Sequence, residues 1–274
     1  MKHTALALAA ALAAASAAAQ DDPLKIGFIY VGPVGDFGWS YQHDQGRLAV
    51  EAAFGDRVET TFVESVSEGA DAERVLRQLA ANGHELIFAT SFGFMDSVLA
   101  VAEQFPEVKF EHATGFKRAD SVSTYSGRFY EGRAVIGTIA GRMTETDKID
   151  YIASYPIPEV IRGVNAATLA ARAVNPEAEM HVVWVNSWYD PPREADAARA
   201  LMAQGVDIIM QHTDSPAPLQ AAENEGLLAF GQASNMHRFG PNAQLTAVID
   251  DWAPYYVKRV QAVLDGTWES QDNW

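Results

Sequence analysis

The sequence predicts an α/β protein with two similar lobes, each built on a parallel sheet. Short β-branched or aromatic runs alternate with segments of helical periodicity, which is the pattern of a parallel sheet covered by helices on both faces. The series begins again near residue 148, and 274 residues are sufficient for two lobes of ordinary size. We expect residues 20–127 and 251–274 to form one lobe and residues 128–250 to form the other.

The N-terminal residues 1–19 are typical of a secretory signal. A short basic start precedes an Ala/Leu core at residues 5–15, and small residues at 17–19 offer a cleavage site. The apolar run is shorter than the ~20 residues that span a membrane. The chain contains no cysteine, which excludes a lipid-modified cysteine at the cleavage point and excludes disulfides. We expect a mature protein that starts near Gln20 and is free in the periplasm.

The first half of the chain is organised around the segment KIGFIYVGPVGDFGWSYQHDQG at residues 25–46. Its apolar run breaks at Gly32-Pro33 and helical periodicity resumes near Ser40, so a strand, a loop and a helix are expected in that order. The following segments repeat this order. Strands are expected at 25–31, 58–64, 85–90, 109–114 and 121–126, and helices at 40–54, 69–82, 95–105 and 130–143.

The second half of the chain shows the same alternation. Strands are expected at 148–154, 180–186, 207–211, 227–231 and 244–249, and helices at 158–174, 191–204, 217–225 and 251–264. The passage at 248–251 is expected to return the chain to the first lobe. Residues 266–274 end on an isolated tryptophan, and we expect that a C-terminal segment is missing.

The net charge of −16 argues against a nucleic-acid partner and against binding to an anionic membrane surface. The charged residues at the start of the second predicted helix are interpreted as an ordinary solvated face. They are Glu64, Glu68, Asp71, Glu73 and Arg74.

Functional residues of a parallel sheet gather after the carboxyl ends of its strands. Here these positions carry aromatic and polar side chains and few cations, which suits a flat, roughly neutral, hydrogen-bonding ring better than a phosphate or a carboxylate. Trp39 and Trp188 are expected to stack on a planar ligand, one from each lobe, unless both pack into a core or a lobe interface. The candidate ligand-binding residues are Phe37, Trp39, Phe92, Phe94, Asp96, Trp188, Asp190, His212, Asp214, Gln232, Asn235 and Asp250.

Other kinds of site are disfavoured by spacing. Gly32, Gly35 and Gly38 follow G-x-x-G-x-x-G and not the dinucleotide pattern G-x-G-x-x-G. No H-x-x-x-H spacing suggests a metal site, and no G-x-S-x-G elbow suggests a hydrolase. We expect no cofactor, no metal and no catalytic residue, so the protein is not expected to be an enzyme.

Several motifs together resemble the basic-membrane-protein family of ABC-importer substrate-binding proteins, which is related to the purine-nucleoside receptor group. These motifs are KIGFIYVGPVGDFGW, TSFGFMD, FPEVKFEHATG, YEGR, VNSWYDP, QGVDIIMQHTD and FGQAS. The resemblance covers essentially the whole mature chain. It implies two Rossmann-like lobes joined by a hinge, a periplasmic binding protein of type I, with the ligand enclosed between the lobes and an ABC permease in the inner membrane as partner.

The resemblance also implies roles for particular residues. Trp39 and Trp188 match the family's two stacking aromatics, and Asp96 matches an acidic residue that binds the edge of the base. The family's ribose-binding aspartates are absent from residues 231–236, GQASNM. This departure favours a free purine base such as adenine, with His212, Asp214 and Gln232 near its polar edge.

Three functions therefore stand beside one another at the level of the sequence. The first is capture of adenine or a related nucleobase for an ABC importer. The second is capture of a purine nucleoside or a sugar, since sugar sites also use aromatics and carboxylates. The third, from a different class, is a secreted α/β enzyme that processes nucleosides, which needs a general acid or base beside its pocket.

Overall fold

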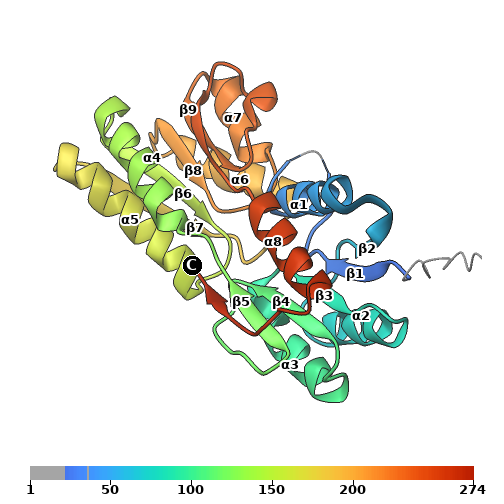
Figure 1. Ribbon diagram of the computed structural model, residues 1–274. Coiled ribbons are helices and arrows are strands. Elements are labelled where there is room, and N and C mark those ends of the chain that lie inside the picture. Colours follow the sequence, from blue (N-terminus) through green and yellow to red (C-terminus); the bar gives the residue numbers. More distant parts are fainter. Residues whose placement is uncertain (1–21, 36) are drawn as a thin grey trace, which may run out of the picture.

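The computed structural model describes residues 22–35 and 37–274. It shows an α/β protein with two parallel sheets, each covered by helices (Figure 1). We call the part built on the first sheet lobe 1 and the part built on the second sheet lobe 2. The predicted secretory signal at residues 1–19 lies outside the described residues.

The sheet of lobe 1 has the strand order β11-β5-β4-β3-β1-β2, and its neighbouring strands are parallel. Helices α1, α2, α3 and α8 cover its two faces. The strands are β1 (Leu24–Ile29), β2 (Val58–Val63), β3 (Leu86–Ala89), β4 (Lys109–Ala113), β5 (Val122–Tyr125) and β11 (Asp272–Asn273). The helices are α1 (Trp39–Phe54), α2 (Ala70–Ala81), α3 (Met95–Gln104) and α8 (Ala253–Leu264).

Both faces of β1 are covered, which explains its continuous apolar run. Phe28 lies on the face of α1 and α8, where its ring stacks on Phe88 at a centroid distance of 4.8 Å and lies 5.6 Å from the ring of Tyr256. Ile29 packs on the other face, against α2 and α3. Lobe 1 therefore has a core on each side of its sheet, and α8 completes one of them although it follows lobe 2 in the sequence.

The sheet of lobe 2 has the strand order β10-β9-β8-β6-β7, and its neighbouring strands are also parallel. Its strands are β6 (Lys148–Ala153), β7 (Glu179–Trp184), β8 (Ile208–Gln211), β9 (Leu228–Ala233) and β10 (Gln244–Ile249). Its helices are α4 (Phe129–Met143), α5 (Pro158–Val174), α6 (Pro191–Met202) and α7 (Ala217–Glu225). Helices α4 and α5 lie side by side (Figure 1), and close approach requires Gly137, where a Cβ would lie 2.3 Å from the carbonyl oxygen of Ala167.

The predicted strands and helices are confirmed, each within about two residues of its observed limits. Short 3-10 turns lie at Gly55–Arg57, Phe92–Phe94 and His237–Phe239. The two-residue strand β11 was not predicted, because its pairing with β5 depends on a partner about 148 residues earlier in the chain.

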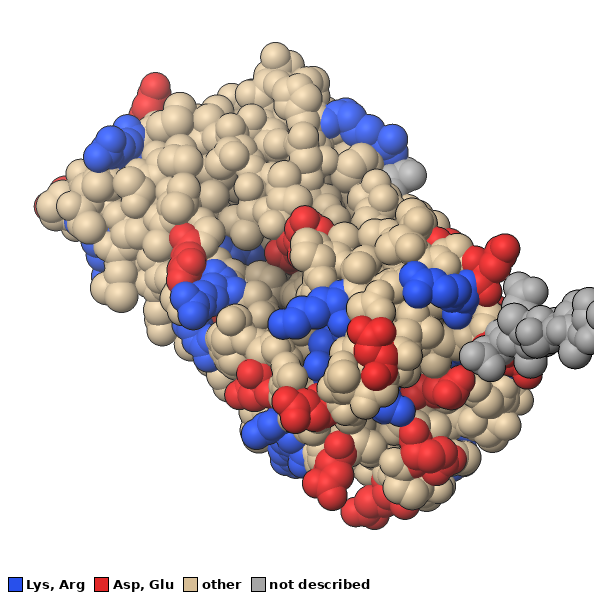
Figure 2. Space-filling view, in the orientation of Figure 1, with Lys and Arg blue, Asp and Glu red and all other residues tan. Residues whose placement is uncertain are grey.

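The two lobes also differ at their surfaces. On the face seen in Figure 2, charged side chains gather over α2 and α3 of lobe 1, while the part over α4 and α5 shows few. Val135 on α4 and Leu169 on α5 are exposed apolar side chains. In the described part of the chain, no helix is long and apolar enough to span a membrane.

Candidate ligand site between the two lobes

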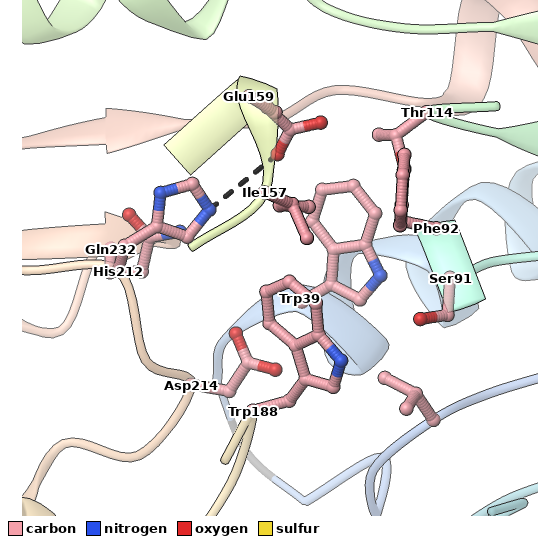
Figure 3. A pocket seen from close by; sticks show the side chains of 11 residues that line it. Trp39, Ser91, Phe92, Thr114, Ile157, Glu159, Trp188, His212, Asp214 and Gln232 are labelled. Atoms are coloured by element: carbon pink, nitrogen blue, oxygen red, sulfur yellow. Dashed lines mark ion pairs between the residues drawn. The ribbon is translucent and has the colours of Figure 1, made fainter. Parts of the chain in front are cut away.

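A cavity lies between the lobes, at the ends of strands from both sheets (Figure 3). The space between the lining side chains, including the part that is open to solvent, is about 350 Å³. Lobe 1 lines it with Val31, Trp39, Ser91, Phe92 and Thr114, and lobe 2 with Ile157, Glu159, Trp188, His212, Asp214 and Gln232.

Trp39, the first residue of α1, is held by the protein through its ring nitrogen. Nε1 donates a hydrogen bond to the carbonyl oxygen of Thr90 at 2.6 Å. Its indole also makes edge-to-face contacts with Phe129 and Trp252, at centroid distances of 5.9 and 5.5 Å. Because the nitrogen is already bonded, the indole offers the cavity its apolar ring and no donor.

Trp188, in the loop before α6, is held in the same way but from the other lobe. Its Nε1 donates to Oε1 of Glu68 at 3.0 Å, and Oγ of Ser91 donates to the same oxygen at 2.7 Å. A Cβ at Gly93 would lie 2.0 Å from the carboxyl carbon of Glu68, so a side chain at this position would displace the carboxylate from its present place. Glu68 is exposed, as the sequence suggests, and its carboxylate also links Trp188 of lobe 2 to lobe 1 through this hydrogen bond.

Asp214 places a buried carboxyl group in the wall of the cavity. Burial raises its pKa well above the ordinary value, and the nearby acids Glu194 and Asp250 raise it further, while a hydrogen bond from the backbone N–H of Trp39 lowers it. The loop of lobe 1 reaches Asp214 through Gly38, where φ is +96° and a Cβ would lie 2.4 Å from the Asp214 carbonyl oxygen.

Glu159 and His212 form a second polar pair in the cavity wall. Nε2 of His212 lies 3.6 Å from Oε1 of Glu159, as drawn in Figure 3. Burial lowers the pKa of His212, and the hydrogen bond with Glu159 acts in the opposite direction. Glu159 is in the first turn of α5, where an acidic residue also favours the helix, so sequence analysis did not single it out.

Comparison with known proteins identifies the family. The family described as "ABC transporter substrate-binding protein PnrA-like" matches residues 24–274. The chain belongs to this family. It is thus an ABC substrate-binding protein, and the family that its motifs resemble is confirmed.

Two relatives of this substrate-binding protein are informative. A protein named purine-binding protein from Brucella abortus (strain 2308) is 57% identical over 269 residues, which cover 98% of this chain and 77% of that protein. A protein named as a glucose-binding protein of an ABC transporter, from Haloferax volcanii, is 41% identical over 255 residues, which cover 93% of this chain and 65% of that protein.

Solved structures of ABC solute-binding proteins share the fold. One from Aeropyrum pernix K1 has a TM-score of 0.80 at 19% identity and covers 92% of this chain and 74% of that chain. One from Conexibacter woesei DSM 14684 has a TM-score of 0.72 at 21% identity and covers 91% and 84% of the two chains. The predicted α/β architecture with two parallel sheets is confirmed.

Six of the residues singled out in the sequence of the substrate-binding protein line the cavity: Trp39, Phe92, Trp188, His212, Asp214 and Gln232. Two phenylalanines do not. Phe37 packs on lobe 2, edge-to-face with Phe239 at 5.0 Å and 4.7 Å from the guanidinium of Arg238. Phe94 is fully buried in the core of lobe 1 beneath α2 and α3.

Three polar candidates also lie away from this cavity. Asp96 is exposed and forms an ion pair with Lys117 at 2.8 Å. Asp190 caps α6 and accepts a hydrogen bond from the backbone N–H of Arg193 at 3.2 Å. Asn235 is exposed, and its side chain accepts hydrogen bonds from its own lobe.

Asp250 is buried beside the site rather than in its lining. Its pKa is raised to about 8 by burial, lowered by Arg133 and raised by Glu159. Arg133 also lowers the pKa of His212. Arg133 therefore lies close to the polar wall of the cavity, although it was quoted in the sequence only within the motif YEGR.

Several residues with left-handed backbone conformation lie at or just after the carboxyl ends of strands, and one of them, Thr114, lines the cavity. Ser65, Thr114, Asn186 and Ala233 have φ values of 55°, 59°, 51° and 56°, and they follow or end β2, β4, β7 and β9. A left-handed conformation costs a residue with a side chain ~1–3 kcal/mol and is often found in ligand-binding segments. Asp147, the remaining such residue in the described chain, precedes β6.

Proposed function

We propose that this substrate-binding protein captures a free purine base, such as adenine, between its two lobes. The observation that carries the proposal is the placement of the indoles of Trp39 and Trp188 in the lining of one cavity. Both ring nitrogens are bonded to the protein, so the indoles can contribute their faces to a ligand. Stacking on a planar base is worth ~1–3 kcal/mol for each aromatic side chain.

The charges around the cavity support a base without phosphate or carboxylate groups. Glu159 and Asp214 line the cavity, Asp250 lies close to them, and Arg133 is a cation close enough to lower the pKa of Asp250. The described residues that line the cavity include no lysine or arginine, so an anionic ligand would be buried there without a cationic partner. A ring with an exocyclic amino group, such as adenine, offers donors that carboxylates accept.

The name of the Brucella abortus relative supports the same class of ligand, since that protein is named purine-binding. We propose that Trp39, Phe92, Trp188, His212, Asp214 and Gln232 contact the base, with Glu159 as a further contact. The other residues expected from the sequence, Phe37, Phe94, Asp96, Asp190, Asn235 and Asp250, would act on the ligand only indirectly.

In this proposal the cavity binds the base for delivery to an ABC importer. Residues 20–127 and 251–274 form one lobe and residues 128–250 the other, and closure of the lobes about a hinge encloses the base. The closed protein, in the periplasm after removal of its signal, is recognised by an ABC permease in the inner membrane. Closure of domains around a ligand is a common way to signal occupancy.

A sugar is the second candidate ligand, because the Haloferax volcanii relative is named as a glucose-binding protein. Aromatic rings and carboxylates also suit a sugar. The two candidate ligands differ in how much of their binding free energy comes from stacking between the indoles of Trp39 and Trp188. A purine stacks on both indoles with its two ring faces, whereas a sugar is bound more through hydrogen bonds from its hydroxyl groups to the carboxylates.

Isothermal titration of the mature protein with adenine, hypoxanthine, adenosine, inosine and glucose tests the proposal. We expect adenine to bind most tightly and to quench tryptophan fluorescence. Tight glucose binding with no competition from adenine would contradict it. Incubation with adenosine, followed by chromatography, tests the enzyme alternative, and we expect no free adenine to appear.

A further inference from the structure

Arg133 is one of the largest buried side chains of the protein, with 2% of its surface exposed. It projects from α4 into lobe 2, where Nη1 donates to the carbonyl oxygen of Gln211 at 3.1 Å and Nη2 donates to Oε1 of Gln232. Its guanidinium lies 5.7 Å from the ring centre of Tyr151. Burial of a charged side chain costs free energy unless hydrogen bonds compensate for it, so a buried arginine at this position calls for an explanation.

The bond to Gln232 fixes the orientation of an amide that lines the cavity. A guanidinium has only donors, so the amide of Gln232 must turn its oxygen toward Arg133. The amide nitrogen then points to the other side and is the atom that Gln232 can offer to a ligand. Without Arg133 the amide would be free to rotate and present either group.

The polar wall of the cavity thus has a defined pattern. Gln232 presents a donor, whereas the carboxyl groups of Glu159 and Asp214 present acceptors when ionised. All three belong to lobe 2, as Figure 3 shows from the elements that carry them. A ring that fits this wall needs an unprotonated ring nitrogen near a group that donates hydrogen bonds.

We propose that Arg133 is a positioning residue that makes Gln232 an obligatory donor, and that Gln232 recognises an unprotonated ring nitrogen of the base. This inference rests on the proposed capture of a purine and adds the atom pair that sets its specificity. Adenine has such nitrogens at positions 1, 3 and 7, and replacing one of them by a C–H group removes one acceptor without changing the shape of the ring.

The test is a titration of four proteins with adenine and with 1-, 3- and 7-deazaadenine. In the wild type we expect one of the three analogues to bind about tenfold or more weakly than adenine, since a buried donor is left unpaired. In Gln232→Met, which keeps the length of the side chain but has no donor, we expect adenine and that analogue to bind equally.

Arg133 is tested with two variants of the same site. In Arg133→Met the amide is released, and we expect the ratio between adenine and the sensitive analogue to fall toward one. In Arg133→Lys, whose ammonium group is also only a donor, we expect the ratio to be largely retained. Circular dichroism and the melting temperature show whether each variant is folded. If an Arg133 variant does not fold, the Gln232→Met variant still tests the role of the Gln232 donor.

The inference is overturned if Gln232→Met keeps the wild-type ratio for every analogue, or if Arg133→Met weakens all ligands by one common factor. Both results are compatible with tight binding of adenine, so they leave the proposed function intact. Binding of adenine no tighter than glucose by the wild type would instead reject the proposed function and this inference with it.

Discussion

Nε1 of Trp188 lies 3.0 Å from Oε1 of Glu68, so an indole of lobe 2 is held by a carboxylate of lobe 1. The same oxygen accepts a hydrogen bond from Ser91 of lobe 1. The bond between Trp188 and Glu68 can exist only while the lobes are close together. Glu68 should therefore stabilise the closed form and not the isolated lobes.

Glu68→Ala is expected to increase the rate of ligand dissociation by about three- to tenfold, with little change in the association rate. The size follows from one hydrogen bond to an exposed carboxylate, ~1 kcal/mol. Stopped-flow fluorescence measures both rates. Glu68→Gln, which keeps an acceptor oxygen, should lie closer to the wild type. Glu103→Ala, an exposed carboxylate on α3, serves as the matched control, and an equal effect there would contradict the role of Glu68.

Trp39→Ala and Trp188→Ala are each expected to weaken purine binding by about 5- to 150-fold, which corresponds to the ~1–3 kcal/mol of one stacking contact. Titration calorimetry measures the change. Trp274→Ala is the control, because this exposed indole packs on Arg162 outside the cavity. Affinity that is unchanged when Trp39 and Trp188 are both replaced would exclude the stacking arrangement.

Gly38→Ala is expected to weaken ligand binding by about tenfold or more. A Cβ there would lie 2.4 Å from the carbonyl oxygen of Asp214, and the φ of +96° is unfavourable for alanine. Gly35→Ala separates the two causes, because Gly35 also has a positive φ but its Cβ would meet nothing within 4 Å. Calorimetry on both variants should show a small effect for Gly35→Ala, and equal effects would mean that backbone strain alone matters.

Asp150 lies on β6, between β8 and β7 of the lobe 2 sheet, and both of its carboxyl oxygens are buried. Burial raises its pKa well above the ordinary value. In the unfolded chain the carboxyl ionises near pH 4. As the pH rises above that value, ionisation favours the unfolded chain, so the free energy of unfolding decreases. This decrease ends once the pH has passed the folded-state pKa of Asp150.

Asp150→Asn removes this ionisation and is expected to raise the free energy of unfolding by ~1–3 kcal/mol at pH 8, with a smaller gain at pH 4. Urea denaturation at the two pH values measures the difference. Asp120→Asn, an exposed site, should change neither value by more than ~0.5 kcal/mol. A gain from Asp150→Asn that is the same at both pH values would show that ionisation is not its cause.

The elements of the fold were predictable because they depend on local periodicity and on turn residues. Trp39 and Trp188 were also predictable as cavity residues, since each follows a strand, and large aromatics in such loops need a surface to cover. Their stacking on a ligand stays a prediction. The same reasoning placed Phe37 in the site, but its ring packs on Phe239 of the other lobe.

The residues that the sequence did not reveal depend on distant parts of the chain. Arg133 reaches Gln232 across 99 positions, and Trp188 reaches Glu68 across 120. Within their own segments Arg133 and Glu68 are indistinguishable from ordinary charged residues of a helix or a loop. These two side-chain pairs follow from the packing of α4 against the sheet of its own lobe and from the packing of one lobe against the other, which periodicity does not describe.

The charged and amide side chains that line the cavity all come from lobe 2, whereas lobe 1 supplies rings, hydroxyl groups and an aliphatic residue. Under the proposed function, the groups that select a ligand therefore lie mainly in lobe 2, whereas the two clamping indoles come one from each lobe. Gene duplication followed by a few changes in lobe 2 would produce receptors for other flat molecules while lobe 1 stayed the same. An engineer seeking a sensor for a new aromatic compound would accordingly randomise positions 159, 212, 214 and 232 and keep the other half unaltered.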